Sequence, residues 1–140
     1  MVNTKEGGFF IVGSSTNSLT QDRDILAIKL TAEGTVEWVG LYGVAADDRG
    51  LGVFQLGDGG YVITGHSHSG GANSPNSSFA LKLTSGGVKI WAKLIKSQNA
   101  ASLSQSVIED NEHVYLAGMS QGFGISNSQD IAVIKLTLGG

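Results

Sequence analysis

The chain repeats a short pattern at a nearly constant distance, and this repetition limits the folds that it can adopt. The pattern occurs three times, as GGFFIVGSS (7–15), GGYVITGHS (59–67) and EHVYLAGMS (112–120). A second pattern, Lys-Leu-Thr-x-x-Gly, begins at positions 29, 82 and 135, which lie 53 residues apart. Two patterns with one period indicate similar structural units that stack on one another.

Turns marked by glycine divide the middle repeat into four short segments. We expect strands at 50–56, 61–67, 79–83 and 88–95. The glycine pairs between them supply the positive φ angles that tight hairpins need. The segments are rich in β-branched residues and are interrupted by glycine about every ten positions, which excludes a helical interpretation. The chain therefore predicts about eleven strands, each antiparallel to its sequence neighbours, and no helix.

The expected strands are apolar on both faces, as in Phe9-Phe10-Ile11-Val12. A sheet with one wet face would alternate apolar and polar residues, whereas a sheet covered on both sides gives nearly continuous apolar runs. Four-stranded units of about 40–50 residues, each packed between neighbours, are typical of β-propeller blades. The sequence therefore predicts an all-β repeat domain over residues 1–140, with units at 1–49, 50–102 and 103–140. The last unit is expected to lack its outer strand.

The repeated residues resemble those of a known group of propeller repeats. The first half of the pattern is Asp58-Gly59-Gly60-Tyr61 with Gly65, and the second half is Lys29-Leu30 with Gly34 and Trp38. Together they resemble the bacterial SBBP or delta-60 repeats, which form four-stranded, kelch-like blades. The third repeat has Asn111-Glu112-His113 in place of Asp-Gly-Gly, so an altered first hairpin is expected there. The resemblance implies about three blades and no particular activity, since such folds host many functions.

The repeats are too few to close a ring. Dividing the length by the period gives about 2.6 units, whereas a propeller needs at least about four blades. An open stack would expose two apolar faces, one of them at Ile131-Ala132-Val133-Ile134. We therefore expect either a piece of a longer propeller or a homo-oligomer, most simply a two-fold dimer with six blades. Ile134→Asp is expected to break such a ring.

The composition excludes several classes of partner and site. The chain has no cysteine, so it has neither disulfides nor thiolate metal sites, and its cellular compartment stays open. Its formal charge is −3 and its nine Lys and Arg residues are scattered, so nucleic-acid binding is not expected. No apolar stretch approaches the roughly 20 residues of a membrane helix, so no membrane partner is expected. No Ser-His-Asp order, phosphate loop or dinucleotide fingerprint is present, and no cofactor is expected.

The candidate binding residues lie beside long polar loops. In a propeller, these loops would gather on one face and the tight turns on the other. Long polar loops on a rigid scaffold are where binding residues concentrate. The long loops are expected at 14–23, 42–49, 66–78, 96–102 and 119–129.

His66 and His68 are the sharpest local feature at these loops. Residues two apart on a strand point to the same side, so the two histidines could share a metal ion. The other repeats supply no matching histidine as a third ligand, and a solvated loop edge is the simpler interpretation. We assign no metal site.

Asp47, Asp48 and Arg49 form a second charged group beside a loop. Adjacent carboxylates can serve in acid–base chemistry or bind Ca²⁺, but local salt bridges and strand-end caps are the commoner role of such clusters. The group Asp22-Arg23-Asp24 has the same two interpretations. The candidate binding residues are therefore His66, His68, Asp47, Asp48 and Arg49, and no catalytic residue is assigned.

The leading functional hypothesis is a non-enzymatic propeller module that binds a protein or a glycan through its loop face. Trp38 and Trp91, which lie 53 residues apart, are expected to pack between blades rather than stack on sugars. One alternative is a fragment of a propeller hydrolase or lyase with its site at the central funnel. Another is a purely structural assembly unit. A carboxylate pair aimed into the funnel would favour the enzyme.

Overall fold

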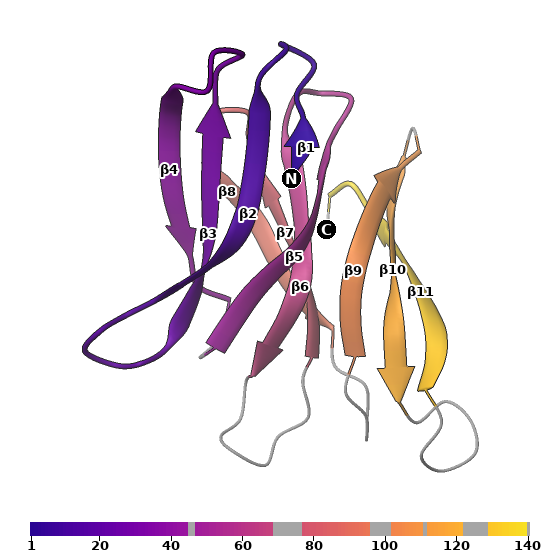
Figure 1. The fold of residues 1–140 in the computed structure, drawn as a ribbon. Coiled ribbons are helices and arrows are strands. Elements are labelled where there is room, and N and C mark those ends of the chain that lie inside the picture. Colours follow the sequence, from indigo (N-terminus) through magenta and orange to yellow (C-terminus); the bar gives the residue numbers. More distant parts are fainter. Residues whose placement is uncertain (45–46, 69–76, 96–101, 111, 122–128, 140) are drawn as a thin grey trace.

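The computed structural model describes residues 1–44, 47–68, 77–95, 102–110, 112–121 and 129–139. These residues form eleven strands and no helix, as predicted (Figure 1). The strands are β1 (Val2–Asn3), β2 (Phe9–Thr16), β3 (Arg23–Leu30), β4 (Val36–Tyr42), β5 (Asp47–Gln55), β6 (Tyr61–His68), β7 (Ser77–Leu83), β8 (Lys89–Ile95), β9 (Ser102–Glu109), β10 (His113–Gln121) and β11 (Gln129–Thr137).

The strands pair in three antiparallel groups. The first group is β1–β4, the second is β5–β8 and the third is β9–β11, and within each group sequence neighbours pair. A single parallel pair, Arg23 with Asp47, joins β3 to β5, so the first two groups form one eight-stranded sheet. The third group is a separate three-stranded sheet. In Figure 1 the three groups stand side by side.

The lysine of each repeat occupies the same place in the strand register. Lys29 pairs with Phe10, Lys82 pairs with Val62 and Lys135 pairs with Tyr115. On the other side Lys29 pairs with Trp38 and Lys82 with Trp91, and a β-bulge follows each lysine. The sequence period therefore corresponds to a repeated strand geometry.

Tight turns join the strands at one end of the groups. Gly7, Gly34, Gly59 and Gly87 have φ angles of 88°, 81°, 84° and 82°, a region that favours glycine. The first hairpin of the third group differs from the others. The Asp110 N–H donates to the His113 carbonyl, and the Asp110 Oδ1 accepts bonds from the backbone N–H groups of Glu112 and His113. An aspartate thus organises the turn that glycines organise elsewhere, in keeping with the altered hairpin expected there.

Two apolar clusters lie between the groups. Between the first and second groups, Phe10 stacks on Tyr61 with 3.9 Å between ring centroids, and Trp38 meets Phe10 edge-on at 5.4 Å. The second cluster lies between the second and third groups and contains Leu56, Val62, Val107 and Val114. The second group is therefore covered on both sides, as its strand β7 shows, in which every residue is buried.

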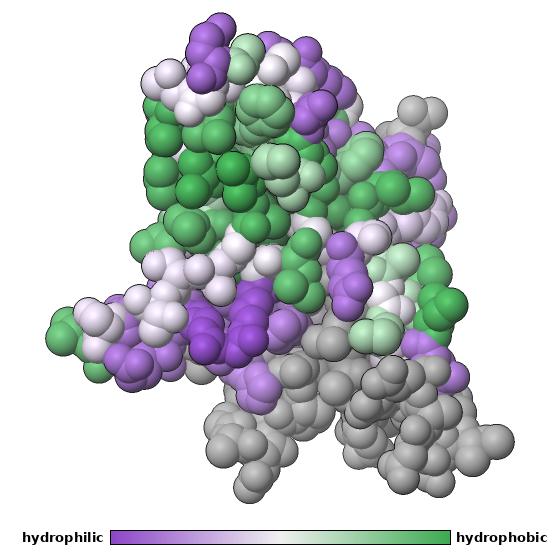
Figure 2. All heavy atoms as spheres, in the orientation of Figure 1, coloured by the Kyte–Doolittle hydropathy of each residue, from purple (hydrophilic) through white to green (hydrophobic). Residues whose placement is uncertain are grey.

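Each group presents two faces, which we name by their residues. The leading face carries Phe10 in the first group, Val62 in the second and Tyr115 in the third; the trailing face carries Phe9, Tyr61 and Val114. The leading face of one group packs on the trailing face of the next. Within the described part of the chain, two faces are left open, the trailing face of the first group and the leading face of the third. Figure 2 shows the former as a broad apolar area over β2, β3 and β4.

One residue that the sequence analysis placed on an open face, Ile134, lies on a packed face instead. Ile134 pairs with the buried Leu116, so it lies on the trailing face of the third group, which packs on the second group. Ile131 and Val133 lie on the open leading face instead. The sequence could not separate them, because all these neighbouring residues are apolar.

Candidate functional site

The five candidate binding residues lie together at one end of the second group. β5 and β6 pair so that Asp47 faces His68, Asp48 faces Ser67 and Arg49 faces His66. This end lies opposite the tight turns, and the β2–β3 loop leaves the first group at the same end (Figure 1). Parts of the long loops expected at 42–49, 66–78, 96–102 and 119–129 lie outside the described residues, namely 45–46, 69–76, 96–101 and 122–128. We call Arg23, Asp47, Asp48, Arg49, His66 and His68 the loop-end cluster.

Asp47 is the centre of a charge network that links two groups of strands. Its Oδ2 lies 3.4 Å from the Arg23 guanidinium of β3, and its Oδ1 lies 3.8 Å from Arg49 Nε. All three side chains are about one third or more exposed, so each pair adds little to stability. Arg23 and Arg49 instead make this end of the strands polar and accessible to solvent.

Asp48 points away from Asp47 because successive strand residues face opposite sides of a sheet. Its side chain is fully buried, and its Oδ2 accepts a 2.6 Å hydrogen bond from the Val44 N–H. Asp48 therefore caps the backbone that enters β5. The two carboxylates do not form a pair aimed at one point.

His66 and His68 lie on the same side of β6, as their spacing predicted. Burial, with the nearby Arg49 charge, lowers the pKa of His66, so its imidazole stays neutral to lower pH than usual. The buried Nδ1 of His66 has no hydrogen-bond partner among the described residues. A polar atom of this kind can accept or donate a bond to a ligand.

Metal ligands do not gather in the described part of the chain. There, no group of three or more His, Asp or Glu side chains is placed to hold a metal ion. The two histidines share their edge with Arg49, whose positive charge opposes a cation.

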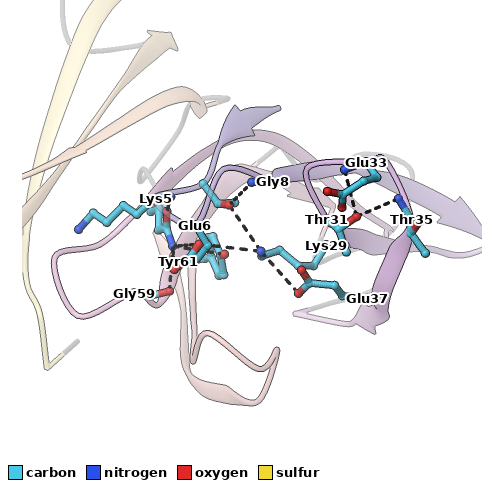
Figure 3. Close-up of polar contacts among 12 residues, drawn as sticks. Lys5, Glu6, Gly8, Lys29, Thr31, Glu33, Thr35, Glu37, Gly59 and Tyr61 are labelled. Carbon is cyan, nitrogen blue, oxygen red and sulfur yellow. Dashed lines mark hydrogen bonds and ion pairs between the residues drawn. The ribbon is translucent and has the colours of Figure 1, made fainter.

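A second polar cluster, which sequence reasoning missed, lies at the turn end (Figure 3). Lys29 is only 4% exposed, and its ammonium lies 3.6 Å from Glu37, 3.9 Å from Glu6 and 3.5 Å from Thr4 Oγ1. Gln55 of the second group donates to Glu6 and accepts from the Lys5 N–H at 2.7 Å. The signal in the sequence was the lysine that recurs in each repeat. These contacts join the first two groups, and we interpret them as structural.

The two tryptophans lie between groups, as expected. A Cβ at Gly87 of the second group would lie 3.0 Å from the Trp38 ring, so the ring reaches the β7–β8 turn. The Trp91 indole N–H donates to the Leu138 carbonyl at 3.1 Å, which ties the second group to the residues after β11. Both rings are partly buried, and neither lies at the loop-end cluster.

No family model matches the chain, and no curated protein matches its sequence. The described residues contain no helix long and apolar enough to cross a membrane. The arrangement of the strands and of the loop-end cluster is therefore the basis for a functional proposal.

Proposed function

We propose that this chain is a non-enzymatic β-propeller module whose three strand groups act as blades. The proposal rests on the repeated register of Lys29, Lys82 and Lys135 and on the packing of each leading face on the next trailing face. Four-stranded antiparallel units that stack face to face are the building block of a propeller.

The loop end of this module binds a protein or a glycan. The observation that carries this proposal is the loop-end cluster, in which two arginines, two histidines and Asp47 share one edge of the strands. Arg49 is exposed over 44% of its side chain, and the buried His66 Nδ1 lacks a partner among the described residues. Exposed arginine beside unsatisfied polar atoms suits recognition of carboxylates, amides or hydroxyls.

A binding role fits the carboxylates better than an enzymatic one. Retaining and inverting glycosidases need two carboxyl groups that face one substrate. Here Asp47 is held by two arginines and Asp48 bonds to Val44 on the other side of the strand. These contacts favour positioning and recognition over proton transfer.

Selection from a glycan array and a phage-displayed random-peptide library tests the proposal. We expect a ligand to be enriched by the wild type, and Arg49→Ala and His68→Ala to weaken its Kd about 10-fold or more, or about 1.4 kcal/mol. The matched control is Lys89→Ala, an exposed cation at the turn end of β8. The proposal is wrong if neither library yields a ligand, or if Lys89→Ala weakens binding as much as Arg49→Ala does.

A further inference from the structure

The two open faces carry the same kinds of residue that are buried elsewhere in the molecule. On the open trailing face, Ile11, Ile28 and Leu30 are only partly buried. One period later, Ile63, Leu81 and Leu83 are fully buried against the first group. The neighbouring Val39 and Leu41 of β4 are 56% and 58% exposed. This face therefore exposes apolar residues at positions that are buried where one group packs on another.

The open leading face shows the same contrast. Ile131 and Val133 are 86% and 67% exposed, whereas their equivalents one and two periods earlier are at most 1% exposed. These equivalents are Ser78 and Ile25 for Ile131, and Ala80 and Ala27 for Val133. An open apolar pocket lies on this face between Ile108, Tyr115 and Val133.

The lysine of the third repeat indicates which group should cover that face. Lys29 and Lys82 are 4% and 8% exposed, and each reaches toward the turn of the following group. Lys29 shares a pocket with Ser85 and Gly86, and Lys82 lies 3.4 Å from the Leu138 carbonyl. Lys135 is exposed. Glu33 lies one period before Gly86, so a first group placed on this face would bring a carboxylate to Lys135.

We infer that a second copy of this chain covers both faces, with the trailing face of its first group on the leading face of the third group. The contact continues the packing that already joins the groups within one chain. It is heterologous, because two different surfaces meet, and such contacts form a ring when the rotation closes. Propellers have about four to eight blades, and two copies of the three groups that the described residues form give six.

Substitutions that disable one face at a time test this inference. Val39→Asp places a charge on the open trailing face and Val133→Asp on the open leading face, and both positions are exposed within one chain, so folding should be retained. Each variant disables both contacts of the ring, and we expect dimer affinity to fall about 100-fold. Leu19→Asp, at a loop residue that is 92% exposed, is the control and should remain dimeric.

Mixing the two variants distinguishes this contact from a symmetric one. The mixture keeps one contact with two wild-type faces, so light scattering should show a one-to-one pair that neither variant forms alone. If the same face paired with itself, one of the two variants would stay dimeric. That result, or a monomeric wild type at micromolar concentration, would overturn the inference.

A cross-link in the wild-type protein gives a second readout that needs no substitution in the faces. Carbodiimide treatment of mixed isotope-labelled and unlabelled chains should join Lys135 of one copy to Glu33 of the other, and Glu33→Gln should remove this product. A Glu33–Lys135 product found only within one chain, or no such product, would contradict the register.

Discussion

Tyr61 shows at the scale of a single residue how the stack is held together. It is fully buried, and its ring stacks on Phe10 of the first group. Burial, with the nearby charges of Glu6 and Glu37, raises the pKa of its hydroxyl from 10.0 to about 12. Since the unfolded chain releases this proton at lower pH than the folded chain does, the free energy of unfolding should fall as the pH rises between these values. We expect a loss of about 1–2 kcal/mol in urea unfolding.

Tyr61→Phe isolates this effect, because phenylalanine keeps the stacked ring and has no proton to release. The decrease in unfolding free energy above pH 10.0 should be clearly smaller in the variant. A smaller decrease should persist, because burial also raises the pKa of Tyr42. If the variant and the wild type lose equal stability across this pH window, Tyr61 is not buried as described.

The spacing of residues along a strand was enough to predict part of the candidate site. The common side of His66 and His68 followed from the two-residue period of a strand. The ion pair between Arg23 and Asp47 did not, because it depends on the single parallel pair that joins β3 to β5. Nothing in the local sequence specifies a contact between side chains that are 24 positions apart.

At the scale of elements, the second and third groups come into close contact where β5 passes β9. A Cβ at Gly52 would overlap the Gln105 carbonyl oxygen and lie 2.9 Å from Thr64 Oγ1. Gly52→Ala should therefore force β9 away from β5 and lower the free energy of unfolding by about 1–3 kcal/mol. Urea unfolding measures this change.

Gly86→Ala is the matched control for Gly52→Ala. The nearest atom to a Cβ at Gly86 is Thr84 Oγ1 at 3.9 Å, an ordinary contact. Its effect should stay within about 0.5 kcal/mol. Equal stability of both variants would mean that the third group does not approach the second as closely as described.

Strands and turns were predictable because their chemistry is local. Gly59 and Gly87 adopt the positive φ angles that their place in the hairpins required. The face on which a strand residue lies was not predictable, because strands covered on both sides carry no alternation. Ile134 and Val133 illustrate this: one packs on the second group and the other is exposed.

At the scale of the whole molecule, the period of 53 residues predicted the three groups and their open ends. The ligand was not predictable, because a repeated scaffold fixes the packed faces and leaves the loop end free to vary. The histidine pair of the loop-end cluster occurs in the second group only, since the positions equivalent to His66 are Ser14 and Met119. The three groups are thus alike in packing and different at the surface proposed to bind.

Sedimentation equilibrium of the wild-type chain tests directly whether a second copy covers the open faces of this stack. We expect a single species at micromolar concentration with twice the chain mass of 14.5 kDa. A mass equal to that of one chain across this range, or an open series of larger species, would contradict it.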